Sequence, residues 1–133
     1  MGVLDTNAVV LLDRLEPDDL PAEPLITAIT LAELSVGPLV ADDPAVRERR
    51  QARLQEAEAA FDPLPFDASS ARAFGRVATA LRRAGRQVRP RAFDALIAAS
   101  AIARELPVYT CNPRDFAGIE ELTVVPVPHP DGA

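Results

Sequence analysis

The 133-residue sequence contains no lysine and no tryptophan, and it has a single histidine and a single cysteine. Without lysine the chain can have neither the phosphate-binding lysine of a P-loop nor a Schiff-base lysine. The only histidine, His129, lies close to the C-terminus, so a Ser-His-Asp triad is not expected. The single cysteine, Cys111, cannot form an internal disulfide. These absences exclude several common classes of enzyme.

Long hydrophobic runs are also absent. No apolar stretch approaches the roughly 20 residues of a membrane span, and the N-terminus lacks the pattern of a signal peptide. Together with the unpaired cysteine, this favours a cytoplasmic protein with no membrane association. The length suits one domain, which we expect over residues 1–128, with a flexible tail over 129–133.

Acidic residues are missing from one long segment. The net charge is −6, but residues 68–93 contain no Asp or Glu and carry seven arginines, which leaves −13 on the rest of the chain. Such an asymmetry indicates either a surface for phosphates or an acidic partner, or a solvated helix face. The arginines are Arg72, Arg76, Arg82, Arg83, Arg86, Arg89 and Arg91.

Strand and helix patterns alternate along the sequence. Short apolar runs predict strands at 2–5, 24–28, 62–66, 107–111 and 122–127. Helices are predicted at about 7–15, 30–37, 44–60, 67–84 and 90–105, with Asp43 and Pro44 starting the third. Two prolines place 62–66 at a sheet edge. This alternation predicts an α/β fold with a central parallel sheet of four to five strands flanked by helices.

Three acidic residues near expected strand ends each have a structural explanation. Asp5 follows the first strand, but Asp5, Thr6 and Asn7 could each cap the next helix. Glu33 lies three residues after Thr30, which is the spacing of a capping box. Asp115 lies in a turn after the strand at 107–111 and could serve that turn.

Asp94 is the most informative acidic position. At helical spacing it shares a face with Ile97, Ala98 and Ala101, so its carboxylate faces packed protein or a cleft. A partly buried charge requires compensation, and Arg91 one turn earlier could supply it in a structural ion pair.

The four carboxylates could converge on one end of a parallel sheet, because ligands bind at the carboxyl ends of such strands. Two carboxylates about 4 Å apart repel by roughly 4 kcal/mol at an effective dielectric near 20. A cluster of this kind needs protons, arginines or a divalent cation. Oxygen ligands without histidine suit Mg²⁺ or Mn²⁺.

Four motifs carry a family resemblance. The segments "VLDTNAVV", "ITLAELSVG", "RAFDALIAASA" and "YTCNPRDF" resemble, in order, the acidic motifs of PIN-domain proteins, and most of all those of VapC-type toxins from bacterial toxin–antitoxin pairs. The resemblance maps Asp5, Glu33, Asp94 and Asp115 onto the catalytic acidic quartet.

The resemblance also implies individual roles. Asp5, Asp94 and Asp115 would bind metal, while Thr6, Asn7, Thr110 and Asn112 match the supporting polar positions. Some family members carry Asp at the position of Asn112, which leaves open whether Asn112 or Asp115 faces the metal, and we favour Asp115. Cys111 stands where arginine or another polar residue is more usual.

The resemblance implies a single-domain PIN-like fold and a Mg²⁺- or Mn²⁺-dependent endoribonuclease toxin that leaves 3′-hydroxyl and 5′-phosphate ends. Its partners would be RNA, a cognate antitoxin and a second copy of the chain in a homodimer. The arginine-rich segment would contact the RNA backbone or the antitoxin.

Two other interpretations remain open from the sequence. A receiver-like phosphoacceptor domain fits the length and alternation, but it normally uses a phosphate-clamping lysine, which this chain lacks. An aspartyl-phosphate phosphatase would use Asp5 as nucleophile. Such sites usually place a second aspartate two residues on, where this chain has Asn7.

Overall fold

Four short parallel strands form one sheet in the computed structural model, which describes residues 1–132. The order across the sheet is β2-β1-β3-β4. The strands are β1 (Gly2–Leu4), β2 (Pro24–Leu25), β3 (Val108–Thr110) and β4 (Val124–Pro126). The predicted α/β fold with a parallel sheet is confirmed.

Successive side chains of a strand point to opposite faces of the sheet, and both faces are buried because helices cover them. In β1, Val3 packs into one hydrophobic cluster and Leu4 into another. Neither side chain is exposed to solvent. Val3 pairs with Leu25 of β2, and Leu4 pairs with Tyr109 of β3.

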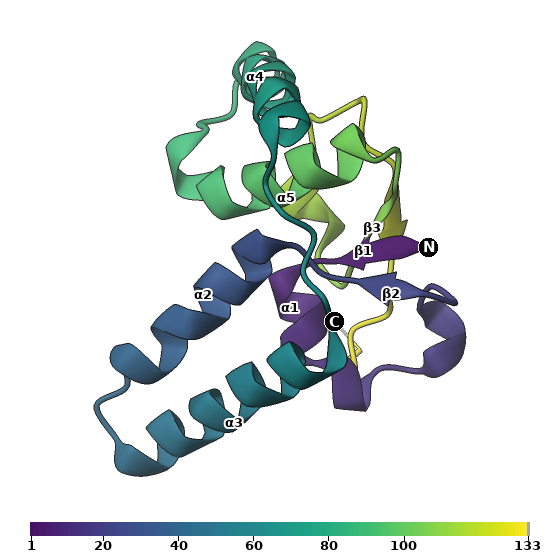
Figure 1. Cartoon of the computed structure of the whole chain (residues 1–133). Coiled ribbons are helices and arrows are strands. Elements are labelled where there is room, and N and C mark those ends of the chain that lie inside the picture. The colour runs from purple at the N-terminus through teal and green to yellow at the C-terminus, as the bar shows by residue number, and fades with distance from the viewer. Residues whose placement is uncertain (133) are drawn as a thin grey trace.

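Helices cover the two faces in separate groups (Figure 1). One cluster includes side chains from α1 (Thr6–Val10), α2 (Ala28–Leu39) and α3 (Pro44–Ala60). The other lies beneath α4 (Ala68–Arg83) and α5 (Ala92–Ala103), which pack against each other. In Figure 1, α2 and α3 form a hairpin that projects away from the sheet.

Several predicted helix boundaries are confirmed. Asp43 caps α3 by accepting a hydrogen bond from the Ala45 N–H at 3.1 Å, and Pro44 is the first helical residue. Asp67 caps α4 by accepting from the Ser70 N–H at 2.9 Å. The 3₁₀ turn Arg89–Arg91 precedes α5, so that helix begins slightly later than predicted.

The predicted capping box of α2 is wrong. Thr27, not Thr30, is the N-cap, and its hydroxyl accepts from the Thr30 N–H at 3.4 Å. Glu33 therefore lies one turn further into the helix than a capping glutamate. Pro38 also lies inside α2, near its end, and the helix continues to Leu39.

Two other elements are shorter than predicted. The helix expected over 7–15 ends at Val10 and is followed by a 3₁₀ turn, Leu12–Arg14. The edge strand expected over 62–66 is a single parallel bridge between Thr27 and Leu64, since flanking prolines cannot donate to a ladder.

The C-terminal residues return to the start of the chain. Asp131 forms an ion pair with Arg14, and the Asp131 N–H donates to the ring of His129. Residue 133 lies outside the described residues, and the division into a domain over 1–128 and a flexible tail stays a prediction. No helix in residues 1–132 is long and apolar enough to cross a membrane.

Arg104, just after α5, ties that helix to the start of α4. Its guanidinium donates to the Pro65 carbonyl at 2.9 Å and to the Ser70 hydroxyl at 3.2 Å, and lies 3.4 Å from a carboxylate oxygen of Asp67. The side chain is only 21% exposed. Several hydrogen bonds therefore depend on one partly buried cation.

We expect Arg104→Ala to lower the free energy of unfolding by about 1–3 kcal/mol, because hydrogen bonds to a charged group are lost together. Arg82→Ala is the control, since Arg82 is exposed and forms no ion pair within residues 1–132; its effect should stay within about 0.5 kcal/mol. Urea unfolding measures both. Equal effects of the two substitutions would contradict this role of Arg104.

Candidate active site

Asp5 lies immediately after β1 and is almost fully buried, with 2% of the residue exposed. One carboxylate oxygen accepts from the Ala8 N–H at 2.9 Å, so Asp5 itself is the N-cap of α1. The other accepts from the Thr110 hydroxyl at 2.6 Å, across 105 positions of sequence. Of the three residues that the sequence offered as caps, only Asp5 caps α1, and Thr6 and Asn7 do not.

Glu33 reaches back from α2 to α1. Its carboxylate accepts a hydrogen bond of 2.6 Å from the hydroxyl of Thr6. The same hydroxyl lies 3.1 Å from the hydroxyl of Thr30, which is completely buried. Glu33 is therefore fixed by a chain of hydroxyl groups and not by the end of its own helix.

Thr30 is a supporting residue that the sequence analysis missed. The capping-box spacing to Glu33 predicts Thr30 as a cap, but Thr27, three residues earlier, could equally cap the helix. The signal in the sequence for this supporting role is that Thr30 is a second threonine, one turn after Thr27, on an otherwise apolar helix face.

Asp94 lies in the first turn of α5, which has no side-chain cap. Its side chain is partly buried, as the small neighbours on its helix face predicted. Arg91 lowers the pKa of Asp94 through its charge but forms no ion pair with it. The structural ion pair considered from the sequence is therefore not formed.

Asp115 lies in η4, the 3₁₀ turn Pro113–Phe116 that follows β3. Its N–H donates to the Asn112 carbonyl at 3.0 Å, and the Asn112 N–H donates to the Thr110 hydroxyl at 2.9 Å. The Asn112 side chain makes no capping hydrogen bond and the residue is exposed. Asp115 is partly buried, and after the larger effect of burial its charge adds to the raised pKa values of Asp5 and Asp94.

Electrostatics tie the four acidic residues together. Burial and then the charges of Asp115, Asp5 and Glu33 raise the pKa of Asp94 to about 7. Burial is also the main cause that raises the pKa of Asp5, and the Asp115 charge adds to it. Burial and the Asp5 charge raise the pKa of Glu33, while the hydrogen bond from Thr6 opposes them. The fold thus brings four like charges into mutual range.

The cluster has no cation of its own. Within residues 1–132, none of the four carboxylates forms an ion pair. In this conformation no three His, Cys, Asp or Glu side chains of the same residues are arranged as ready-made metal ligands. The donors are nevertheless oxygen atoms of uncompensated carboxylates, which is the chemistry that Mg²⁺ and Mn²⁺ prefer. The donor atoms of these residues therefore have the chemistry that a divalent cation requires.

Cys111 lies beside this cluster. Burial and the charge of Asp5 raise the pKa of its thiol, so it stays protonated near neutral pH. The thiol therefore adds no charge to the acidic site.

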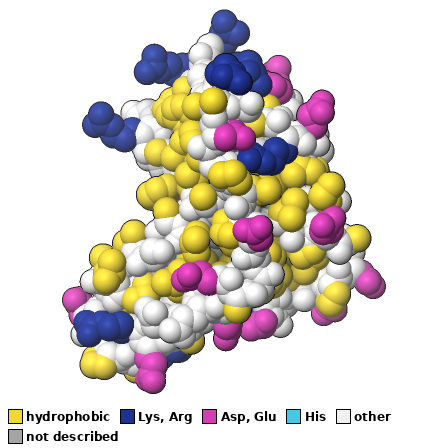
Figure 2. Space-filling view, viewed as in Figure 1, with side chains coloured by type: hydrophobic (Ala, Val, Ile, Leu, Met, Phe, Trp, Pro, Cys, Tyr) yellow, Lys and Arg dark blue, Asp and Glu magenta, His cyan; other side chains and the backbone are white. Residues whose placement is uncertain are grey.

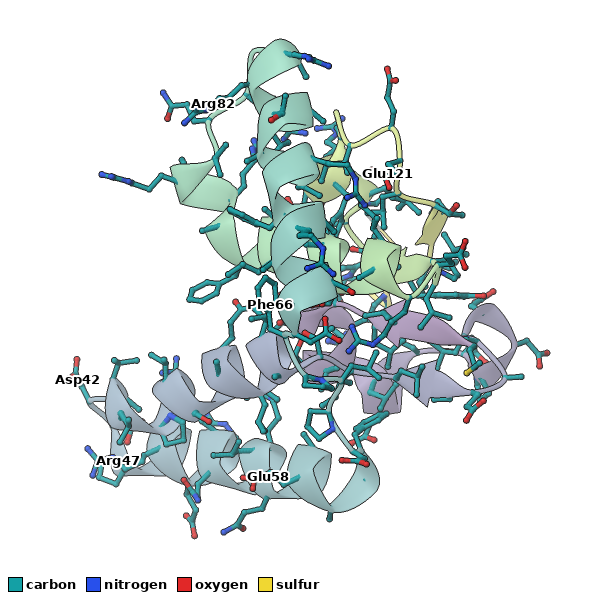
Figure 3. All side chains as sticks on the ribbon, turned by 45° about the horizontal axis from the view of Figure 1, so that its top comes forward. Asp42, Arg47, Glu58, Phe66, Arg82 and Glu121 are labelled. Carbon is teal, nitrogen blue, oxygen red and sulfur yellow. The ribbon has the colours of Figure 1, made fainter. Side chains whose placement is uncertain are left out.

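The arginines of residues 68–93 lie on and after α4. Figure 2 shows dark blue side chains gathered at that end of the molecule, and a hollowed outline between it and the α2–α3 hairpin. Arg76 is engaged in a two-bond pair with Glu121, at 3.0 and 3.1 Å. Five others form no ion pair within the described residues: Arg72, Arg82, Arg83, Arg89 and Arg91. Arg82 extends away from the protein in Figure 3.

The raised pKa of Asp94 predicts a pH-dependent stability for the metal-free protein. The folded pKa of about 7 exceeds the ordinary aspartate pKa of 3.8, so between these pH values the folded state binds more protons than the unfolded state. The free energy of unfolding therefore falls as pH rises from 4 to 7. Asp94→Asn should be more stable than wild type at pH 8, and the difference should shrink towards pH 5.

Thermal unfolding in EDTA at pH 5 and pH 8 measures this effect. Asp42→Asn is the matched control, because Asp42 is exposed at the tip of the α2–α3 hairpin (Figure 3). That variant should follow the wild type at both pH values. A stability difference between Asp94→Asn and wild type that does not change with pH would contradict the electrostatic coupling.

Comparison with known proteins gives a consistent family. The PIN domain family model matches residues 2–122. Ribonuclease VapC5 of Mycobacterium tuberculosis is 38% identical over 122 residues, which cover 90% of this chain and 87% of that protein. The tRNA(fMet)-specific endonuclease VapC of Shigella flexneri is 31% identical over 121 residues, covering 86% and 88%.

Solved structures agree with the sequence relatives. A crystal structure of VapBC-5 from M. tuberculosis, a member of the VapBC family of toxin-antitoxin systems, matches with a TM-score of 0.81 and 35% identity, covering 95% of this chain and 98% of that chain. DNA-bound VapBC from Salmonella typhimurium matches with a TM-score of 0.75 and 28% identity, covering 92% and 95%. The chain therefore belongs to the PIN-domain family and is a homologue of the VapC ribonucleases.

Proposed function

We propose that this protein is a divalent-metal-dependent endoribonuclease, the toxin of a toxin–antitoxin pair. The observation that carries the proposal is the cluster of Asp5, Glu33, Asp94 and Asp115, four carboxylates from separate elements that form no ion pair within residues 1–132. Burial, and then the charges of other members of the cluster, raise the pKa values of Asp5, Glu33 and Asp94. Relatives named as ribonucleases supply the substrate class.

The four carboxylates would have two different roles at this site, metal binding and proton transfer. Asp5, Asp94 and Asp115 would hold Mg²⁺ or Mn²⁺, because two of them flank the ends of neighbouring strands and Asp94 faces both. A bound divalent cation supplies Lewis-acid activation of water and neutralises charge at the phosphate. Thr110 holds one oxygen of Asp5, and Thr6 holds one oxygen of Glu33. We propose that Glu33 receives or orients a proton in the reaction.

The arginines on and after α4 would bind the RNA backbone. Arg82 and Arg89 border one hollow, and Arg72 and Arg83 border another, so the positive charge lies along a surface and not at one point. Contacts between arginine and phosphate position a strand without reading its sequence. An antitoxin with an acidic segment could occupy the same surface.

Other partners and the location are also proposals. Structural neighbours are VapBC toxin–antitoxin structures, which supports a cognate antitoxin for this chain. We propose a homodimer and a cytoplasmic location on the family resemblance. Asn7 and Asn112 are exposed and remain candidate polar contacts at the edge of the site.

The alternative interpretations lose support. A receiver-like phosphoacceptor domain would need a lysine, and a phosphatase would need an aspartate at position 7, where the chain has Asn7. The family match over residues 2–122 is instead to the PIN domain.

We expect cleavage of RNA by wild type with Mn²⁺ or Mg²⁺, and none in EDTA. Total tRNA is the first substrate to test, because one relative is named a tRNA(fMet)-specific endonuclease. Asp94→Asn should lower the cleavage rate by about 100-fold or more, since it removes a metal-binding charge. Gel analysis of end-labelled RNA gives the rate.

Asp42→Asn is again the control, because it removes the same charge at a distant exposed site. It should cleave like wild type. Undiminished cleavage by folded Asp94→Asn, or cleavage by wild type that persists in EDTA, would reject the proposed site.

RNA binding should depend on salt through the arginines. In the Asp94→Asn background, Arg82→Gln with Arg89→Gln should reduce the slope of log K against log salt by about 1.4, which is 0.7 for each lost contact to single-stranded RNA. Fluorescence anisotropy at several salt concentrations measures the slope.

Arg47→Gln with Arg49→Gln removes the same charge from α3, where Figure 3 shows Arg47 at the far end of the hairpin. This control should leave the slope unchanged. The same change of slope in both pairs would show that net charge, and not the surface on and after α4, governs binding.

A further inference from the structure

Arg86 differs from the other arginines in the segment because its guanidinium binds main-chain carbonyls. It lies two residues beyond Ala84, the C-cap of α4, and one of its nitrogens, Nη1, donates to two main-chain carbonyls. The acceptors are the carbonyl of Arg114 at 3.0 Å and that of Ala117 at 2.6 Å. Both belong to the chain around η4, 28 and 31 positions later in sequence.

These carbonyls flank Asp115. The Arg114 carbonyl also receives the Ala117 N–H at 3.2 Å, so it closes the 3₁₀ turn in which Asp115 sits. A cation at the C-terminal end of such a turn is favourable, because the carbonyl oxygens carry partial negative charge there. Arg86 thus donates hydrogen bonds to the carbonyl groups at the end of the turn, from a different part of the chain.

The other contacts of the turn are consistent with a fixed position. Phe116 is buried, with 2% exposed, and anchors the turn in the core. Gly118 has φ of +90°, and a Cβ there would meet the Ala84 Cβ at 3.0 Å and the Arg86 Cδ at 3.5 Å. The chain therefore leaves η4 in close contact with the end of α4, where only glycine fits without strain.

We propose that Arg86 is a positioning residue for Asp115, and that its contribution to activity is to hold the acidic site and not to bind RNA. The proposal rests on the proposed function, since it assumes that Asp115 helps to bind the cation. It assigns different tasks to neighbours in one basic segment: Arg82 is free to meet a phosphate, whereas Arg86 is committed to the protein.

The test compares Arg86→Gln with Arg82→Gln, which removes the same charge from the same hollow. The first readout is the Kd for Mn²⁺ of the RNA-free full chain, measured by titration calorimetry. Arg86→Gln should weaken Mn²⁺ binding by about 10-fold, as removal of an outer-shell partner typically does. Arg82→Gln should change it by less than about 3-fold, the effect of lost surface charge.

The second readout separates positioning from RNA contact. Arg86→Gln should lower kcat and leave KM for RNA near the wild-type value, whereas Arg82→Gln should raise KM. Arg86→Lys, which keeps the charge but loses the planar fork, should bind Mn²⁺ with an affinity between those of wild type and Arg86→Gln.

The outcomes distinguish the two levels of inference. If wild type binds no Mn²⁺, the proposed function fails and this proposal fails with it. If wild type binds Mn²⁺ but Arg86→Gln matches Arg82→Gln in both readouts, only the positioning role is overturned. Should Arg86→Gln not fold, Arg86→Lys decides: weaker Mn²⁺ binding than wild type supports the role, and equal binding overturns it.

Discussion

Mutual repulsion among four carboxylates is the constraint around which the site is built. Burial removes much of the water that would screen them, and no ion pair in residues 1–132 compensates their charge. The protein keeps Asp5 and Glu33 in place with short hydrogen bonds from threonine hydroxyls. Such bonds favour the ionised forms of Asp5 and Glu33 and so oppose the effect of burial, which raises both pKa values.

The supporting hydroxyl groups come from three elements, α1, α2 and β3. Thr110, at the end of β3, serves both Asp5 and the N–H that opens η4, so one hydroxyl links two strand ends. Thr30 links α2 to α1 through Thr6. Because these groups are buried, their positions are set by core packing, and the geometry of the acidic site depends on the packing on both faces of the sheet.

Charge is separated by element. Basic side chains gather at the end of the molecule that carries α4 (Figure 2), whereas Asp5 follows β1 and the other three carboxylates lie on α2, α5 and η4. Most of these arginines form no ion pair within residues 1–132. Arg76 pairs with Glu121, and Arg86 binds main-chain carbonyls.

The sequence alone determined the alternation of elements, the cap at Asp43, and the partly buried position of Asp94. These features depend on local chemistry: side-chain period, proline geometry and capping by short polar side chains. The resemblance of four motifs also gave the family. Local pattern could not choose between Thr27 and Thr30 as the cap of α2, because both have the right chemistry.

Only the tertiary structure decided which polar groups meet. Asp5 and Thr110 are 105 positions apart, and Arg86 is 28 positions from its nearer acceptor. A sequence pattern of period two or 3.6 carries no information about such partners, because they are brought together by the strand order and by helix packing. The acidic residues could therefore be identified from the sequence, whereas the hydrogen bonds that hold them depend on the fold.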